Sequence, residues 1–247
     1  MKKILILLLF VSQVIGAQNT FEQGNQFYQK ENYSAAISSF ESIINSGKQS
    51  AEVYFNLGNC YYKLHKVAPA IYNYEKALLL TPNDSETKTN LDFARKMAID
   101  DIKVIPKVGF NKVIADFTSN YYYDTWAWVA VTFAFVFLLF FIGYYFSHKT
   151  TIKRIFFLGM FVWLLAIIVS IASGFYEKNR NDNERPAIVF AETTTVKSEP
   201  KTTAADAFVL HEGTKVFILE SIANWKKVEL TDETTGWIEE SAIKEIK

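Results

Sequence analysis

Two long apolar segments, separated by SHKTTIKR (147–154), constrain the fold of this chain more than any other feature. The first covers 126–146 and the second 155–176, and neither contains a charged residue. A helix needs about 20 apolar residues to cross the roughly 30 Å hydrocarbon core of a bilayer, where its backbone must satisfy its own hydrogen bonds. We therefore predict two transmembrane helices joined as a hairpin. Two buried core helices of a soluble protein are the alternative.

The N-terminus has the three parts of a secretory signal peptide. Lys2 and Lys3 precede an apolar run over 4–11, and the small residues Gly16 and Ala17 follow it. This apolar run is too short to cross a bilayer. We predict a signal peptide over 1–17 that exports the segment after it. An uncleaved anchor is the alternative and exports the same segment.

The orientation of the hairpin follows from this export. The loop 147–154 contains Lys149, Lys153 and Arg154, as cytoplasmic loops do under the positive-inside rule. Basic residues also flank the outer ends of both apolar segments, so the loop only supports the argument from the signal peptide. We predict a multi-pass protein of the cytoplasmic (inner) membrane, with both soluble parts on the periplasmic side.

A 34-residue self-similarity lies between the signal and the first apolar segment. In AEVYFNLGNCYYKLHKVAPAIYNYEKALLLTPND (51–84), Gly58 and Ala70 allow two antiparallel helices to approach closely, and Pro82 ends the second helix. This spacing resembles the tetratricopeptide repeat. A weaker copy covers 17–50, and the segment SETKTNLDFARKMAI (85–99) predicts a helix that caps the stack.

Both copies also repeat a stripe of residues at positions i, i+4 and i+7 of a helix. Its members are Phe21, Asn25, Tyr28, Phe55, Asn59 and Tyr62. In the tetratricopeptide family this stripe faces the concave groove, so the resemblance implies that these residues bind a segment of a protein partner. Phe21 and Phe55 replace the lysine of the family's carboxylate clamp, which favours an extended or helical segment over a C-terminal peptide. Packing against the capping helix is the alternative reading.

The C-terminal residues 186–247 have the short apolar runs and turn residues of an all-β domain. The stretches LHEGTKVFIL, NWKKVEL and TGWIEESAIKEI, with Gly213, Trp225, Gly236 and Trp237, resemble the bacterial SH3-like domain. That resemblance implies a small barrel, following a polar linker over 177–185. Some members of the family bind peptidoglycan peptides, although packing roles for Trp225 and Trp237 are the simpler reading.

The sequence lacks the residue patterns that are typical of nucleic-acid binding, catalysis and metal binding. The chain has no net formal charge, which argues against nucleic-acid binding. Its one cysteine, Cys60, lies in a predicted packing helix, and His65 would not face it as a base. No nucleophilic triad, phosphate loop or metal-ligand cluster stands out, and His211 has no metal partner at ligand spacing. We expect no enzyme, no cofactor and no metal.

The predicted fold class is a multidomain membrane protein with tetratricopeptide helical hairpins, two transmembrane helices and a C-terminal SH3-like barrel. The predicted parts are a signal peptide (1–17), repeats with a capping helix (18–100), a juxtamembrane segment (101–125), the spans 126–146 and 155–176 with their loop (147–154), a linker (177–185) and the barrel (186–247). This order resembles the BatE family of the Bacteroides aerotolerance operon.

Since no catalytic constellation is found, we predict a membrane-anchored periplasmic scaffold that recruits protein partners through its tetratricopeptide and SH3-like modules. The BatE resemblance implies that the partners are chiefly other membrane proteins of the same operon, in an aerotolerance or envelope-stress complex. Two repeats are fewer than the ~3 usually needed for stability, so self-association is a further expectation. The alternative function is a cell-wall sensor whose SH3-like domain contacts peptidoglycan.

Overall fold

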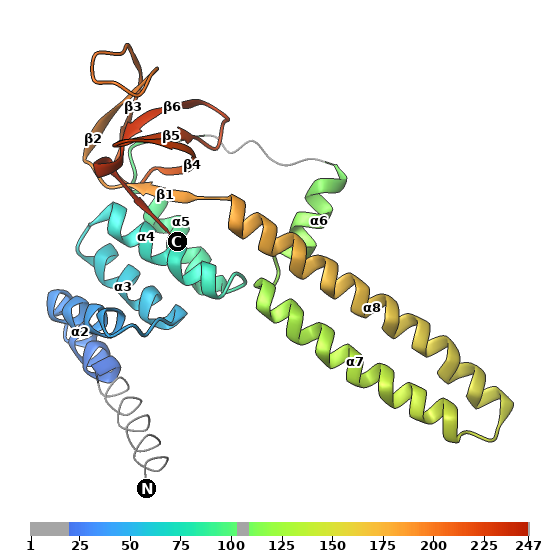
Figure 1. Ribbon diagram of the computed structural model, residues 1–247. Coiled ribbons are helices and arrows are strands. Elements are labelled where there is room, and N and C mark those ends of the chain that lie inside the picture. The colour runs from blue at the N-terminus through green and yellow to red at the C-terminus, as the bar shows by residue number, and fades with distance from the viewer. Residues whose placement is uncertain (1–19, 103–108, 247) are drawn as a thin grey trace, which may run out of the picture. The chain divides into compact units, whose positions relative to one another are not determined.

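The computed structural model of the chain describes residues 20–102 and 109–246 (Figure 1). The predicted signal peptide lies outside these residues. The described residues form two compact units, one from 20–102 with 185–246 and the other from 109–184. We call them the helix–sheet unit and the hairpin unit, and each is described by itself.

The first part of the helix–sheet unit consists of antiparallel helices. They are a helix over 20–29, α2 (Tyr33–Asn45), α3 (Ala51–Lys63), α4 (Val67–Leu80) and α5 (Ser85–Arg95). The side chains of Ser50 and Asp84 accept hydrogen bonds from backbone N–H groups in the first turns of α3 and α5. These two caps are one repeat length apart in the sequence. The helical repeat predicted over 51–84 is therefore confirmed as a helix pair.

The same close contact joins the helices of both predicted copies. A Cβ added at Gly24 would lie 2.6 Å from the ring of Phe40, and one at Gly58 would lie 2.6 Å from the ring of Tyr74. Both contacts are too short for any residue but glycine, because Phe40 and Tyr74 are fully buried. The two contacts recur at the repeat spacing, so the weaker copy packs as the stronger one does.

The C-terminal part forms one antiparallel sheet of seven strands in the order β3-β2-β6-β5-β4-β1-β7. The strands are β1 (Pro186–Val189), β2 (Thr193–Lys197), β3 (Asp206–His211), β4 (Lys215–Ile222), β5 (Trp225–Glu229), β6 (Thr235–Glu239) and β7 (Ile243–Glu245). Among the described strands no pairing joins β3 to β7, so the sheet is open. The prediction of a closed barrel is corrected in this respect.

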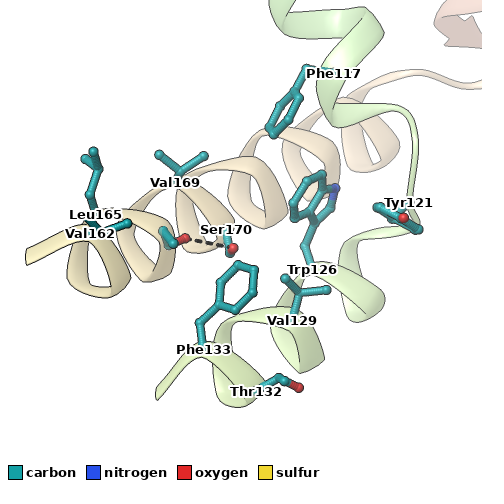
Figure 2. A pocket seen from close by; sticks show the side chains of 11 residues that line it. Phe117, Tyr121, Trp126, Val129, Thr132, Phe133, Val162, Leu165, Val169 and Ser170 are labelled. Carbon is teal, nitrogen blue, oxygen red and sulfur yellow. Dashed lines mark hydrogen bonds between the residues drawn. The ribbon is translucent and has the colours of Figure 1, made fainter. Parts of the chain in front are cut away.

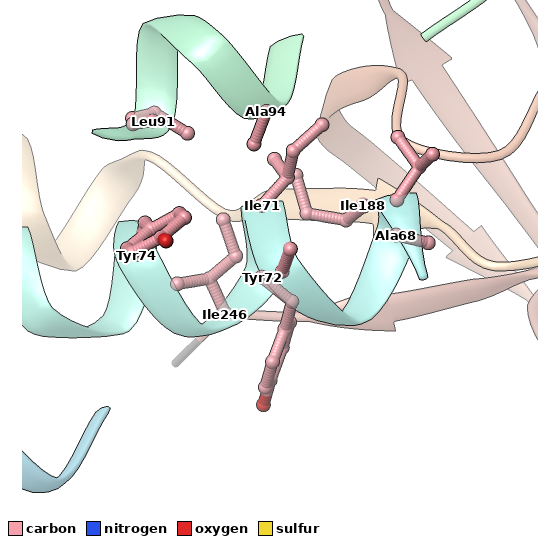
Figure 3. Packing of buried hydrophobic residues seen from close by; sticks show 10 residues of the cluster. Ala68, Ile71, Tyr72, Tyr74, Leu91, Ala94, Ile188 and Ile246 are labelled. Atoms are coloured by element: carbon pink, nitrogen blue, oxygen red, sulfur yellow. The ribbon is translucent and has the colours of Figure 1, made fainter. Parts of the chain in front are cut away.

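Strand β1 is buried on both faces, and this explains why the sheet stays open at that end. Ala187 and Val189 contribute to the core inside the sheet, whereas Ile188 points the other way, into a core made by α4 and α5. Ile246, after β7, enters the same helical core (Figure 3). Successive side chains of a strand face opposite sides. The β1–β7 end is therefore covered by helices rather than closed against β3.

The helices and the sheet therefore share one apolar cluster, which we call the shared core, although each also has a core of its own, and 18–100 and 186–247 belong to one compact unit instead of two separate modules. In Figure 3, Ile71 of α4 and Ala94 of α5 meet Ile188 of β1. The capping helix predicted after Pro82 exists as α5, but its buried side also contacts this shared core. Each half thus covers apolar surface that the other would expose to water.

Two polar clusters stabilise the contact between helices and sheet. The carboxylate of Glu75, only 8% exposed, binds Arg95 Nη2 and Lys215 Nζ, each at 2.8 Å. Burial alone would raise the pKa of Glu75, but Lys215 and Arg95 together hold it below its ordinary value. The buried charge is thereby compensated on both sides, from α5 and from β4.

The second cluster centres on Asp100, just after α5. Its Oδ2 accepts from the backbone N–H of His211 at 2.7 Å and from the hydroxyl of Thr214 at 2.6 Å, while its Oδ1 lies 2.7 Å from His211 Nδ1. Burial opposes ionisation of Asp100, but the hydrogen bonds from Thr214 and His211 lower its pKa overall. His211 therefore serves as a partner of Asp100 at the end of β3.

Gly213 lies at the closest approach between the β3–β4 turn and the helices. Its φ is +89°, and a Cβ there would lie 2.9 Å from Val67 and 3.0 Å from Ile71. Both the backbone conformation and the space require glycine. This position carried an SH3-like motif in the sequence, whereas the structure also gives it a role in packing the sheet on α4.

The hairpin unit contains three helices: α6 (Phe110–Thr118), α7 (Tyr123–Phe146) and α8 (Thr150–Asn183). Both α7 and α8 are long and apolar enough to cross a membrane. The loop between them is shorter than predicted, and residues 177–183 are helical instead of a linker. Charged and amide residues can continue a helix, and no proline interrupts α8 before β1. The predicted juxtamembrane segment likewise contains α6.

Glycines bring α7 and α8 into close contact. A Cβ at Gly143 would overlap the ring of Phe156, and a Cβ at Gly159 would overlap the ring of Phe140. Small residues are the usual means of close approach between helices in lipid, where the hydrophobic effect does not drive helix association. The two apolar segments thus form a packed hairpin, as the sequence predicted.

Helix α6 is attached to both long helices through Thr118. Its hydroxyl donates to Glu177 Oε1 at 2.5 Å, and its carbonyl accepts from Trp126 Nε1 at 2.9 Å. Glu177 is 6% exposed and also pairs with Arg180 at 2.5 Å. This network explains why α8 continues beyond the apolar span, since Glu177 and Arg180 act from its final turns.

Candidate functional site

The residues of the predicted stripe lie on the first helix of each repeat, and all six are half-buried. The rings of Phe21 and Phe55 pack on Phe40 and Tyr74, with centroids 5.7 and 6.1 Å apart. Phe40 and Tyr74 belong to the second helices of the repeats and not to the capping helix, so these contacts decide for neither interpretation of the stripe. Asn25, Asn59 and the two tyrosines have different surroundings.

The two stripe asparagines, Asn25 and Asn59, each accept a hydrogen bond from an asparagine of the corresponding helix one repeat later, so the two bonds are equivalent. Asn56 Nδ2 donates to Asn25 Oδ1 at 3.0 Å, and Asn90 Nδ2 donates to Asn59 Oδ1 at 2.9 Å. Each bond joins the first helix of one repeat to the corresponding helix of the next. Helix α5 thus occupies the place of a first helix in a third repeat. We call this arrangement the asparagine ladder.

Hydrogen bonding also orients the side chain of Asn59. Its Oδ1 accepts a second bond, from the Tyr74 hydroxyl, at 2.7 Å. Because the oxygen has two donors, the amide orientation is determined and Nδ2 is the outer group. Within the described chain, this Nδ2 has no hydrogen-bond acceptor. It is therefore able to donate to a carbonyl or carboxylate that enters the groove.

A pocket of about 360 Å³ lies beside Asn59. Its walls come from the helix over 20–29, α3, α4 and α5, and its lining residues are Tyr28, Asn59, Tyr62, Lys63, Tyr74, Glu86, Asn90 and Phe93. Three of the six predicted residues, Tyr28, Asn59 and Tyr62, are brought together here. Phe21, Asn25 and Phe55 are not part of the pocket lining.

Sequence reasoning missed Asn56, Asn90 and Phe93. A signal for them existed, because the dipeptide Asn-Leu occurs at 56–57 and again at 90–91, one repeat length later. The segment after Pro82 lacks the glycine of the repeat motif, so the motif alone predicts a cap there and no third copy. When the segment is aligned with α3 one repeat length earlier, Asn90 corresponds to Asn56, and Phe93 corresponds to Asn59.

The Cys60 thiol and the Tyr74 hydroxyl are buried, and both stay protonated at neutral pH. Burial raises the pKa of the Cys60 thiol to about 12, so the thiolate that a nucleophile requires is scarce at neutral pH. Burial also raises the pKa of Tyr74, whose hydroxyl therefore remains a hydrogen-bond donor to Asn59. The arrangement can hold a ligand by hydrogen bonds and aromatic contacts.

A second pocket, of about 650 Å³, lies within the hairpin unit between α6, α7 and α8 (Figure 2). Phe117, Trp126 and Phe133 are among its mainly apolar walls. Its polar side chains, Thr132 and Ser170, donate to carbonyls of their own helices at 2.9 Å. Tyr121, which carries a hydroxyl, also lines the pocket, so the surface presented to an occupant is mainly and not wholly hydrocarbon.

Metal and cell-wall sites have little support in the described chain. Residues 20–102 and 109–246 contain no group of three or more histidine, cysteine or acidic residues that could hold a metal ion. Trp237 is 9% exposed, and Trp225 is half-buried, so neither provides an open aromatic platform on the sheet. The peptidoglycan role expected from the SH3-like resemblance is thus without a visible site.

Comparison with known proteins supports the helical repeat. The tetratricopeptide repeat family matches residues 51–84, which form α3, α4 and the turn after them. No curated protein matches the chain. The tetratricopeptide repeat is a non-catalytic element that generally mediates protein–protein interaction. The match therefore suggests a scaffold that binds protein partners.

Proposed function

We propose that the chain is a membrane-anchored scaffold that binds an extended segment of a protein partner along the face carrying the asparagine ladder. The observation that carries this proposal is the geometry of Asn59. Its oxygen is held by Tyr74 and Asn90, the residue lines the pocket, and its Nδ2 has no acceptor in the described chain. A peptide carbonyl is the natural partner for such a donor.

The shared core gives this groove a rigid support. The side of α4 and α5 opposite the groove packs on β1 and β7, so those surfaces are closed to a partner. A preorganised groove loses less conformational entropy on binding. The sheet thus acts in this proposal as a support for the groove and not as a second tethered module.

The membrane part of the proposal rests on the two apolar helices and on the sequence around them. Lys149, Lys153 and Arg154 favour a cytoplasmic loop, and the signal-like N-terminus favours export of the groove to the periplasmic side of the inner membrane. Partners would be membrane proteins with periplasmic segments, such as those of the aerotolerance operon that the BatE resemblance suggests. Self-association stays part of the proposal.

The experiment removes the two stripe asparagines of the ladder and measures which membrane proteins still crosslink to the chain. Chains carrying Asn25→Ala and Asn59→Ala together are crosslinked in native membranes and compared with the natural sequence. We expect crosslinked membrane proteins to be lost while hydrogen exchange in the β-sheet is unchanged. The control is Asn179→Ala, in α8 outside the groove, which should leave the crosslinks intact. Recovery of the same partners with the double variant would refute a role for the ladder.

A further inference from the structure

The side chains at the stripe positions of α5, the third first-type helix of the stack, differ from those of the two helices before it. Positions Phe55, Asn59 and Tyr62 of α3 correspond, one repeat length later, to Thr89, Phe93 and Lys96. An aromatic ring thus replaces the asparagine that both earlier repeats carry. Phe93 is 49% exposed, whereas a phenylalanine that served only to pack the helices would be buried. The ring therefore forms surface at the end of the ladder.

Phe93 is also a wall of the pocket beside Asn59. Tyr28 and Tyr62 are further aromatic walls, and they come from the two preceding first helices. Asn59 and Tyr74 supply polar groups within the pocket, joined by their hydrogen bond. The pocket thus combines aromatic rings with the amides of Asn59 and Asn90, which is typical of a site that takes a side chain together with its adjoining backbone.

Charge around the pocket favours an acidic neighbour. Lys63 lines the pocket, and Lys96 Nζ lies 5.3 Å from the centre of the Phe93 ring. Within the described residues neither lysine forms an ion pair, whereas Glu86 is the single carboxylate in the pocket lining. Lys63 and Glu86 balance one another in the lining, and Asp92 is paired with Arg95. Lys96 beside Phe93 is therefore the charge that favours an acidic neighbour.

We infer that this pocket is the specificity site of the groove and takes an aromatic or large aliphatic side chain of the partner, next to an acidic residue. The inference rests on the proposed function, because it assumes that a peptide lies along the ladder. The backbone carbonyl beside the inserted side chain accepts from Asn59 Nδ2. The inserted side chain packs between Tyr28, Tyr62 and Phe93.

Burial of an aromatic or large aliphatic side chain contributes about 10- to 100-fold to affinity. Such a contribution is large enough to select sequences. The backbone bond to Asn59 is common to all peptides and contributes no selection of side chains. The two residues therefore have separable effects, one on which peptides bind and the other on how tightly every peptide binds.

The test uses the full chain in lipid nanodiscs and a phage library of random dodecapeptides. We expect the selected peptides to share an aromatic or large aliphatic residue with an acidic neighbour. The variant Phe93→Asn restores the repeated asparagine on an exposed position, so it should fold normally. It should lose this preference and bind the selected peptides about 10-fold or more weakly. Asn59→Ala should weaken all selected peptides to a similar degree.

The outcomes distinguish the two proposals. Selection of peptides without a preferred apolar residue, or an unchanged preference in Phe93→Asn, would overturn the specificity site and leave the groove as a peptide-binding surface. Absence of any selected peptide would overturn both. Hydrogen exchange of the α4 and α5 segments, unchanged in Phe93→Asn, establishes that its loss of binding reflects the pocket and not the fold.

Discussion

Glu75 in α4 and Lys215 in β4 stand 140 positions apart in the sequence and meet at 2.8 Å. The pair joins the tetratricopeptide helices to the C-terminal sheet, and Arg95 completes it from α5. A buried carboxylate is costly unless it is paired, so this contact is sensitive to the loss of either partner. The helix–sheet unit should consequently lose stability as a whole when its junction is altered.

Lys215→Met should lower the free energy of opening of the helix–sheet unit by about 2 kcal/mol, because Glu75 then has only Arg95 as a partner. Hydrogen exchange of the full chain should show this in α4 and β4 alike. Lys201→Met is the matched control, since Lys201 pairs with Glu199 on the surface, where both side chains are more than half exposed. It should change stability by less than about 0.5 kcal/mol. Equal effects of the two substitutions would contradict the role given to Glu75.

Ile71→Ala should destabilise both halves of the helix–sheet unit by about 2–5 kcal/mol, because Ile71 is buried in the shared core. Denaturant unfolding followed separately by exchange in α4 and in β1 should show the two segments shifting together. Ile99→Ala, at a side chain 72% exposed, serves as the control and should be close to neutral. If only the helices were destabilised, the sheet would be an independent domain.

Gly213→Ala should cost more stability than Gly47→Ala, although both glycines have positive φ. The backbone term is about 1–2 kcal/mol for each. At Gly213 the new Cβ also meets Val67 and Ile71, whereas nothing lies within 4 Å at Gly47. Overpacking adds about 1–3 kcal/mol. Thermal unfolding of the two variants measures the difference, and the same melting temperature in both would show that the sheet does not press on α4.

Asp100→Asn should reduce stability most at pH 7, and its effect should shrink as the pH falls below about 3.9. The folded pKa of Asp100 is lowered, so the stabilisation by its carboxylate is present above the unfolded value of about 3.9 and is lost as the pH falls through the folded pKa. Urea unfolding at several pH values tests this. Asp101→Asn, at the exposed neighbouring residue, is the control. A difference between Asp100→Asn and the natural chain that did not shrink as the pH fell below about 3.9 would argue against the carboxylate as its source.

Glu177→Gln should release α6 from α8, because it removes the negative charge that pairs with Arg180 and weakens the bond from Thr118. Limited trypsin digestion in nanodiscs should then cleave faster at the exposed Lys112 of α6. The control Lys178→Gln changes the adjacent exposed residue and should leave the rate at Lys112 as it was. Unaltered cleavage in Glu177→Gln would mean that other contacts of Thr118, such as that with Trp126, suffice to hold α6.

Much of the candidate site followed from periodicity. The stripe residues Asn25 and Asn59 could be predicted because a 34-residue repeat places equivalent side chains on equivalent helices. Asn90 and Phe93 were available to the same reasoning and were missed, because the third helix lacks the glycine of the motif. The orientation of Asn59 could not be predicted, since it depends on the Tyr74 hydroxyl, 15 residues away on the facing helix.

The sequence by itself determined the local elements: an apolar hairpin, a helical repeat and a set of short strands. Each of these depends on hydrophobic period, length and turn residues, which are properties of neighbouring positions. The tertiary structure decided how the repeat and the strands combine. Ile188 faces the helices while Val189 faces the sheet, and Glu75 meets Lys215 across most of the chain. Such contacts arise when two apolar faces are buried against one another, and no local pattern specifies which faces will meet.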